Sequence, residues 1–381
     1  MCQSPGAALT IRLRSGTVTV HGRLSAGLAP ALALAATLAA SGTPARASTP
    51  PKTITLQWVG DMAMSTQLGL PPGGVEEALA PIAGTLRSTD LTLGNLEGTL
   101  SVGGTSKCGT TGTATTGTCF AFQAPPSTAV GLRRLGFDLV NQANNHAQDF
   151  GAGGHAQTAA ALKHAGVAWT GDPGQITYLS SHGVRVAFLG FAPYANTSDL
   201  LDIPRAKAMV RTAARHAAIV VVIIHAGAEG ADQLHTPIGT QYFLGENRGN
   251  ARLFAHSVIS AGASVVLGSG PHVIRGVQDD RGHLIAYSLG NFIGYHTLSG
   301  GGVLNDSGII RVTLSAATGR ATAARWIPVT LDAGLPRRTR GDGDAPLVAQ
   351  LSREDFPRSH FDIRSDGRFI LPSRDRSRHV R

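Results

Sequence analysis

Residues 218–225 have the sequence AIVVVIIH, in which seven apolar residues lead directly to an imidazole. A short, continuously apolar run is typical of a strand that is covered on both faces, as in the parallel sheets of α/β proteins. A polar side chain at the end of such a strand requires a partner, because burying it without one costs free energy. The segment therefore predicts an α/β fold and makes His225 a candidate functional residue; the alternative is a core histidine satisfied by hydrogen bonds.

Segments with strand and helix patterns alternate on both sides of this run. We expect strands over residues 54–59, 91–93, 137–140, 184–191 and 265–267, and helices over residues 75–87, 126–135, 155–165, 204–217 and 250–261. Residues 283–288, 309–314 and 323–331 are predicted to be consecutive strands. This order indicates βαβ units followed by a β-rich close within one domain, residues 54–331. Residues 332–381 are polar and rich in Arg and Pro, and we expect a partly ordered C-terminal extension.

The amino terminus has the pattern of an export signal. Arg23 precedes an apolar run over residues 24–40, and Ala45-Arg46-Ala47 supplies an A-x-A cleavage site. These are the parts of a secretory signal peptide, which we assign to residues 1–47, followed by a linker over residues 48–53. The alternative is a single membrane anchor, which Pro30 and the many alanines of the run disfavour. We expect the mature protein to be secreted or located in the cell envelope.

Two of the three cysteines remain after removal of the signal peptide. Cys108 and Cys119 bracket a Gly/Thr-rich segment that has no other evident means of ordering itself. In an oxidising compartment such a pair is expected to form a disulfide, and free thiols are the alternative.

The charge and composition restrict the kind of partner. The formal net charge is +9, with 5% aromatic residues, and residues 1–47 hold four Arg and no acid, so the rest of the chain carries +5. Basic clusters at residues 337–340 and 374–381 would attract an anionic polymer or an anionic surface of the cell envelope; the alternative is a solvated tail. Because aromatic residues are scarce, base stacking is not indicated and we expect no nucleic-acid partner.

Polar side chains fall just after several predicted strands, at the edge where ligands bind in open α/β sheets. Asp149 and Asn291 are further candidates close to these segments. The strand-end residues are Asp61, Glu97, Asn144, Asn145, His146, His225 and His272.

This mixture of carboxylate, amide and imidazole groups suits a divalent metal such as Mn, Fe or Zn. A metal-activated water would be the nucleophile, and a histidine that does not bind the metal could protonate a leaving group. Glu229 lies four residues after His225 and could orient its ring, or be an exposed acid. For Asp61 the alternative is a helix cap, and for Glu97 a solvated acid in a turn. The chain has no G-x-S-x-G elbow, P-loop or dinucleotide fingerprint.

Six short segments in order resemble the CapA-type poly-γ-glutamate capsule biosynthesis family, a branch of the calcineurin-like metallophosphoesterases. The similarity extends over residues 54–296. It implies a four-layer α/β/β/α sandwich that holds one or two divalent metal ions at the strand ends. The segments are VGDMAM (59–64), LGNLEG (93–98), ANNHAQDFG (143–151), IHAGAE (224–229), GSGPHVIRGV (268–277) and YSLGNF (287–292).

The resemblance also implies roles for individual residues. Asp61, Asn145, His225 and His272 would be metal ligands, Glu97 would stand near the bridging carboxylate position, and His146 would be the general acid. Two positions depart from the superfamily pattern, because Ala63 and Gly270 stand where imidazole ligands are expected.

Two functions are therefore consistent with the sequence. The first is a metal-dependent hydrolase that acts on a phosphoester in a cell-envelope or capsule polymer. The second is a non-catalytic envelope protein that binds an anionic polymer such as polyglutamate.

Overall fold

A computed structural model of the chain describes residues 12–13, 16–17, 52–64, 69–109, 119–295, 297–298, 300–339 and 341–371. Residues 1–49 form a unit of their own, in which β1 (Arg12–Leu13) and β2 (Gly16–Thr17) pair as antiparallel strands. The rest of the predicted signal peptide, the first residues of the predicted linker and the basic cluster at residues 374–381 lie outside the described residues. No helix of the described ranges is long and apolar enough to cross a membrane.

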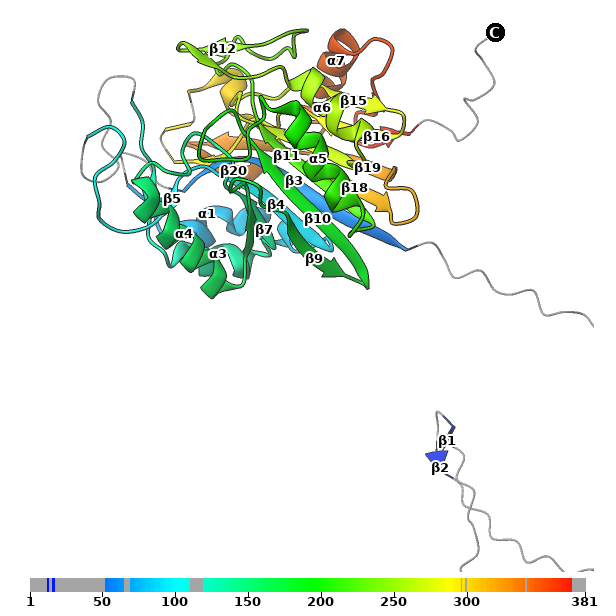
Figure 1. Cartoon of the computed structure of the whole chain (residues 1–381), viewed down its shortest axis with the longest axis horizontal. Helices are drawn as coiled ribbons and strands as arrows, with labels where there is room; N and C mark the ends of the chain where they lie inside the picture. Colours follow the sequence, from blue (N-terminus) through cyan, green and yellow to red (C-terminus); the bar gives the residue numbers. More distant parts are fainter. Residues whose placement is uncertain are drawn as a thin grey trace, which may run out of the picture. The chain divides into compact units, whose positions relative to one another are not determined.

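Two β-sheets form the centre of the unit that spans residues 50–381 (Figure 1). The strands of each sheet are given below in their spatial order, so that consecutive strands are hydrogen-bonded neighbours. The larger sheet contains β20 (Leu335–Arg338), β19 (Ala321–Asp332), β18 (Asp306–Ser315), β3 (Thr53–Ala63), β4 (Leu91–Leu96), β7 (Leu139–Asn141) and β8 (Ala168–Thr170), with β17 (Asn291–Gly294) also beside β3. The smaller sheet contains β15 (Val277–Asp280), β16 (His283–Ala286), β14 (Val265–Ser269), β11 (Ile219–His225), β10 (Val184–Phe191) and β9 (Thr177–Ser181).

Helices cover the outer face of each sheet. The larger sheet packs against α1 (Gly74–Leu79), η1 (Ala80–Ile82), α2 (Ala83–Leu86), α3 (Thr128–Leu135) and α4 (Gly151–Ala165). The smaller sheet packs against α5 (Ile203–Ala214) and α6 (Ala251–Ser260). A third apolar cluster, with Leu93 from one sheet and Ile223 from the other, fills the space between the sheets. These layers confirm the predicted four-layer α/β/β/α sandwich.

Within each sheet the central strands run parallel. β3, β4, β7 and β8 are parallel in the larger sheet, and β10, β11, β14 and β16 in the smaller one. Their carboxyl ends therefore lie at a common edge of each sheet. The apolar run of residues 219–224 is buried throughout, as its sequence predicts.

Residues 332–371, which are predicted to belong to a C-terminal extension, are part of the same folded unit. They form β20, α7 (Ala345–Asp355), β21 (Asp362–Ile363) and β22 (Phe369–Ile370). Val348 and Leu351 of α7, with Phe361 and Phe369, belong to the apolar cluster between the sheets. The boundary at residue 331 therefore does not separate a core from a tail: apolar residues at helical spacing bury one face of α7 despite the polar composition around it.

Short elements complete the fold around the loops. They are the pairs β5 (Thr99–Leu100) with β6 (Gln123–Ala124) and β12 (Tyr242–Phe243) with β13 (Glu246–Asn247), and the 3₁₀ helix η2 (Gly302–Leu304).

Candidate metal centre

The carboxyl ends of strands from the two sheets meet at a cluster of buried polar side chains. Asp61 lies near the end of β3, Glu97 directly follows β4, and His225 is the last residue of β11. His272 follows β14 in a loop and has a positive φ of 61°. Asp61, Glu97 and His225 are fully buried and His272 is 9% exposed. The structure thus brings together four residues that the sequence predicts to share one site.

The side chains of this cluster lie close to one another, but mostly beyond hydrogen-bond length. Asp61 Oδ2 is 3.3 Å from His272 Nδ1, and Asp61 Oδ1 is 3.9 Å from His225 Nδ1. Glu97 Oε1 is 3.7 Å from His272 Nε2 and 3.8 Å from His225 Nε2. One ligand atom each of Asp61, Glu97 and His272 lie within 4.8 Å of one another. Such spacing is compatible with a cation held between carboxylate and imidazole donors.

Several donor atoms in the cluster have no hydrogen-bond partner among the described residues. They are both carboxylate oxygens of Glu97 and Nε2 of His225, and all are shielded from solvent; Oδ1 of Asn145, in the loop after β7, is likewise buried without a partner. Buried polar atoms are normally paired, because leaving one unpaired costs about 1–3 kcal/mol. Oxygen and imidazole donors that are unpaired and converge fit a divalent metal of the Mn, Fe or Zn kind.

The pKa values in the cluster point to a need for positive charge. Burial and the neighbouring Asp61 raise the pKa of Glu97 well above its usual range. Burial lowers the pKa of His272, but Glu97, Asp61 and Glu229 outweigh this and raise it to about 10. A proton held on His272 thus compensates the carboxylates, and a divalent cation between the same groups would supply that charge instead.

Neighbouring side chains fix the two histidine rings. His272 Nδ1 is 2.8 Å from Asn291 Oδ1, so the ring can donate to the amide and keep Nε2 facing Glu97. His225 Nδ1 is 3.2 Å from Ser269 Oγ, a contact that allows the Nδ1–H tautomer and leaves the Nε2 lone pair free. Burial lowers the pKa of His225 well below its usual range, which keeps the ring neutral. Asn291 therefore acts as an orienting residue.

Glu229 does not orient His225, which differs from the sequence-based expectation. Its Oε1 accepts a hydrogen bond from Arg248 Nη1 at 2.6 Å, and its Oε2 faces His272 Nε2 at 3.7 Å. Side chains four residues apart face each other in a helix. Residues 226–229 are not helical, so the Glu229 side chain turns toward a different histidine.

His146 and Asp149 form a second, adjacent polar group in the loop after β7. His146 Nδ1 is 2.8 Å from Asp149 Oδ2, which also accepts from the Phe122 amide at 2.6 Å. Lys107 Nζ is 2.8 Å from Asp149 Oδ1 and donates to the Asn145 carbonyl at 3.0 Å. The Phe122 ring lies 4.4 Å from that of His146. The imidazole is thus held from three sides.

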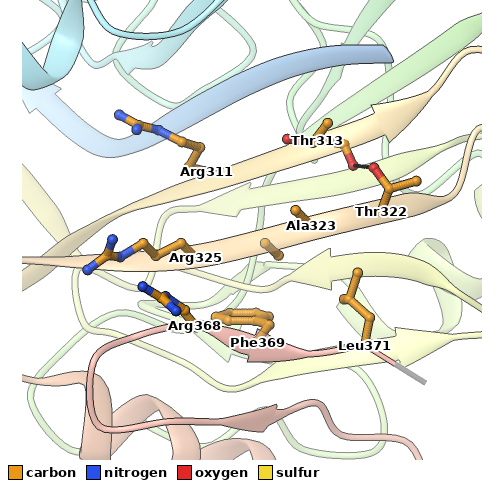
Figure 2. Close-up of a pocket in the computed structure, with 9 residues that line it drawn as sticks. Arg311, Thr313, Thr322, Ala323, Arg325, Arg368, Phe369 and Leu371 are labelled. Atoms are coloured by element: carbon orange, nitrogen blue, oxygen red, sulfur yellow. Dashed lines mark hydrogen bonds between the residues drawn. The ribbon is translucent and has the colours of Figure 1, made fainter. Parts of the chain in front are cut away.

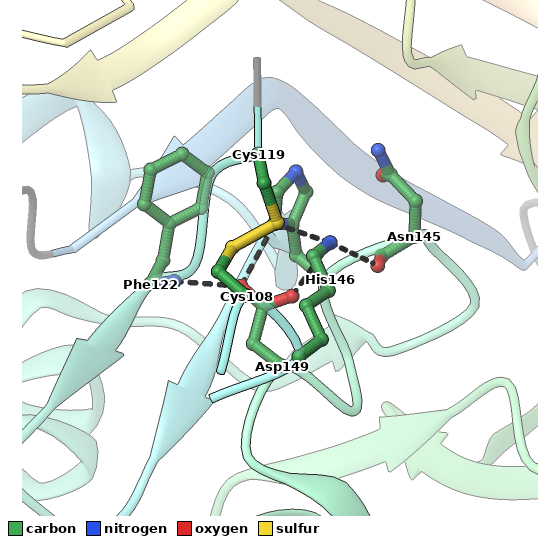
Figure 3. Close-up of a disulfide and its surroundings, with 7 residues drawn as sticks. Cys108, Cys119, Phe122, Asn145, His146 and Asp149 are labelled. Atoms are coloured by element: carbon green, nitrogen blue, oxygen red, sulfur yellow. Dashed lines mark hydrogen bonds and ion pairs between the residues drawn. A yellow bond between two sulfur atoms is a disulfide. The ribbon is translucent and has the colours of Figure 1, made fainter. Parts of the chain in front are cut away.

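A disulfide joins Cys108, the residue after Lys107, to Cys119, and this confirms the predicted pairing (Figure 3). Cys108 and Cys119 have Cα atoms 5.7 Å apart. The bond anchors the residue next to Lys107, which contacts Asp149.

Asn144 supports the turn and not the metal position. Its Nδ2 donates to Asn95 Oδ1 and to the Leu96 carbonyl, and its Oδ1 accepts from the His146 amide. These bonds place Asn145 and His146 relative to β4.

Three residues of the cluster are absent from the sequence-based set. Asn95 Nδ2 donates to Asp61 Oδ1 at 2.8 Å and lies 3.3 Å from His225 Nδ1. Ser269 contacts His225 as described above. Arg248 is 1% exposed and pairs with Glu229. Asn95 and Ser269 stand inside motifs already noted, whereas Arg248 has no signal in the sequence other than its charge.

Gly270, one of the two positions where an imidazole is expected and missing, lies at the cluster and donates its amide hydrogen to Asp61 Oδ2 at 3.1 Å. Gly270 has a φ of +109°, and a Cβ there would lie 3.2 Å from His225 Nε2, so a side chain at this position would strain the backbone and crowd the ring. In the same segment, Ser269 Oγ lies 3.2 Å from His225 Nδ1. Ala63 is fully buried two residues after Asp61 on β3.

The sequence is similar to those of two bacterial capsule biosynthesis proteins. The chain is 31% identical over 183 residues to the PGA biosynthesis protein CapA of Bacillus subtilis (strain 168), covering 42% of this chain and 44% of that protein. It is 30% identical over 193 residues to the capsule biosynthesis protein CapA of Bacillus anthracis, covering 45% and 43%. The matched stretch thus spans less than half the length of these relatives.

Among solved structures, a phosphatase from Mycoplasma pneumoniae superposes with a TM-score of 0.47 at 11% identity, over 76% of this chain and 96% of that one. The fold assignment rests on the layers described above and not on this superposition. Residues 55–296 match the family described as bacterial capsule synthesis protein PGA_cap, a stretch that contains every residue of the metal cluster. The chain therefore belongs to the PGA_cap family of bacterial capsule synthesis proteins.

Proposed function

We propose that the protein is an exported, metal-dependent hydrolase of the phosphoesterase type that acts in the metabolism of a capsule or cell-envelope polymer. The observation that carries the proposal is the buried group of Asp61, Glu97 and His272, with unpaired donor atoms, beside the His146–Asp149 pair. Membership of the capsule synthesis family supports the polymer as the biological context.

Asp61, Glu97 and His272 would hold the metal, with His225 and Asn145 offering the remaining unpaired donors. A divalent metal held there would act as a Lewis acid toward water and toward a phosphoester oxygen. Asn291 and Ser269 keep the two imidazoles in orientation, and Arg248 offsets part of the negative charge through Glu229. These contacts fix the orientation of both imidazole rings in the absence of a cation.

His146 would exchange the proton of the leaving group. Asp149 holds its Nδ1, so Nε2 is the nitrogen available for proton transfer. Lys107 and Phe122 restrict the ring further. The role is that of a general acid that touches the departing oxygen and not of a metal ligand.

Export is supported by the disulfide, because such bonds persist in oxidising compartments outside the cytoplasm. The signal pattern of residues 1–47 adds to this support.

The alternative function is binding of an anionic polymer without turnover. Ala63 and Gly270 favour it, because neither can supply the imidazole that a complete two-metal site uses. A centre with fewer ligands can hold a single metal or serve only to bind.

The test is hydrolysis of a generic phosphomonoester and phosphodiester under added Mn²⁺, together with metal analysis. We expect His225→Ala to lose the metal and the activity, and the exposed control His216→Ala to keep both. His146→Ala is expected to keep the metal and lose about 10²–10⁴-fold in turnover. Loss of metal in His146→Ala would show that its role is misassigned. A metal-free wild-type protein that binds polyglutamate in a salt-sensitive way would favour the alternative.

A further inference from the structure

Three arginines lie in a row across neighbouring backbone segments at a distance from the metal cluster. Arg311 of β18 is the cross-strand partner of Arg325 of β19, and Arg325 forms an antiparallel bridge with Arg368, the residue before β22. Directly paired residues of antiparallel strands have Cα atoms about 5 Å apart and side chains on the same face. The row therefore places three arginines on one face of neighbouring backbone segments.

The row lies on the outer face of the larger sheet. Ile310 and Trp326, the neighbours of Arg311 and Arg325 in sequence, point into the apolar cluster between the sheets, so the arginines point the other way. Arg325 and Arg368 are exposed and Arg311 is half-buried. The three line a groove, which also contains Thr313, Thr322 and Leu371 (Figure 2).

Like charges that face each other directly across strands destabilise a sheet. Their neutralisation within the protein is incomplete. Asp366 Oδ2 lies 3.1 Å from Arg368 Nε, but Arg325 donates only to a neutral acceptor there, the Asp366 carbonyl, at 3.2 Å. Arg311 donates to Gln57 Oε1 and Ser88 Oγ, which are also neutral. Its buried Nε has no partner among the described residues.

The titration of Arg311 agrees with this geometry. Burial, followed by the charge of Arg325, lowers the pKa of the Arg311 guanidinium. The row thus stores electrostatic repulsion that an anion bridging the guanidinium groups would relieve.

We propose that this arginine row is a binding site for a linear polycarboxylate with an aliphatic backbone. Guanidinium groups bind carboxylates through paired N–H donors. Beyond the row the groove is lined by Ala323 and Leu371, which offer apolar contact to a hydrocarbon backbone and less to a sugar–phosphate chain. The identity of the polymer rests on the proposed role in capsule metabolism, whereas the site itself does not depend on the metal cluster.

The test is the affinity of the full chain for fluorescently labelled poly-γ-glutamate, measured by anisotropy at low salt. We expect Arg325→Gln/Arg368→Gln to weaken binding by about tenfold and to reduce the salt dependence, because two contacts to anionic groups are lost. Arg311 is left unchanged in this variant, since its bonds to Gln57 and Ser88 tie β18 to its surroundings. The matched control is Arg205→Gln/Arg211→Gln, which removes the same charge from exposed positions of α5.

Equal weakening in the two double variants would overturn the proposal, because the binding would then follow net charge alone. If Arg325→Gln/Arg368→Gln weakened the binding of polyphosphate but left the binding of poly-γ-glutamate unchanged, the choice of polymer would be overturned. Both variants are expected to keep wild-type metal content and phosphoester hydrolysis. Row-dependent binding in a protein without metal or hydrolysis would support this site while contradicting the proposed enzymatic function.

Discussion

Gln57 and Asp61 lie four residues apart on β3, and both side chains are fully buried, yet their surroundings differ. Gln57 Nε2 donates to two backbone carbonyls and to the Thr92 hydroxyl at 2.8–3.0 Å, and Arg311 donates to its Oε1. Around Asp61, the oxygens of Glu97 and Nε2 of His225 have no partner within the described ranges. One strand thus carries a satisfied polar network and an unsatisfied one.

The difference indicates that the buried polar side chains around Gln57 have a structural role and that those around Asp61 have a functional one. The network of Gln57 ties α2 to β3 and contains no carboxylate. The network of Asp61 contains two carboxylates held near each other, which costs free energy unless a cation joins them. We infer that the first is complete as folded and that the second is built for a ligand.

The largest expected effect concerns Arg248, which pairs with Glu229 at the edge of the Asp61 cluster. Arg248→Met would leave Glu229 without its 2.6 Å partner in a largely buried position and is expected to lower the free energy of unfolding by about 3 kcal/mol. Urea denaturation measures the change, with the exposed Arg211→Met as a control that should shift by less than about 0.5 kcal/mol. An unchanged Arg248→Met would mean that Glu229 needs no counter-charge.

Paired substitutions on the two networks sharpen the comparison directly. In metal-free protein, Gln57→Ala is expected to lower the free energy of unfolding by about 2 kcal/mol, because three acceptors lose their donor. Glu97→Gln is expected to raise it by about 1 kcal/mol at neutral pH, because a buried carboxylate beside Asp61 is removed. Chemical denaturation after chelator treatment measures both. Destabilisation by Glu97→Gln would indicate that the cluster is satisfied without a cation.

The smallest expected effect on stability concerns Asp344, which lies outside the metal cluster and makes stability depend on pH. Burial raises its pKa to about 7 despite a hydrogen bond from Trp326 Nε1 at 2.6 Å. Since the folded-state pKa exceeds the unfolded one, Asp344 destabilises the fold increasingly as pH rises from about 4 to 7, and fully above that. Asp344→Asn should therefore gain about 1 kcal/mol at pH 8 and little near pH 4. Thermal unfolding at both values measures this, and an equal gain at both would contradict the assigned pKa.

Much of the fold follows from local patterns in the sequence. The predicted strand at residues 184–191 has the bounds of β10, and Asn250, which caps α6 by accepting from the Leu253 amide, marks the predicted start of that helix. The start of α4 at Gly151 was predicted four residues late, because its first turns are rich in glycine. Gly154 is required there by close packing, since a Cβ would lie 2.7 Å from Phe150 Cβ.

The sequence predicts the site only for residues that directly follow parallel strands, because strand direction determines where these residues lie. Asp61, His225 and His272 follow strands, so their convergence could be expected from the topology of parallel sheets. The pairing of Arg248 with Glu229 depends on the path of the connection between β11 and α6, which no periodic pattern describes. Metal ligation and the catalytic role of His146 stay predictions.

The central claim is that the Asp61 cluster holds a divalent metal, and elemental analysis of the purified protein tests it most directly. The wild-type protein, reconstituted with Mn²⁺ or Zn²⁺ and freed of loose ions, is expected to retain at least about one metal per chain, and Glu97→Gln much less. Gln57→Ala should retain as much metal as the wild type. A wild-type protein that keeps no metal, or a Glu97→Gln variant that keeps as much, would contradict the account.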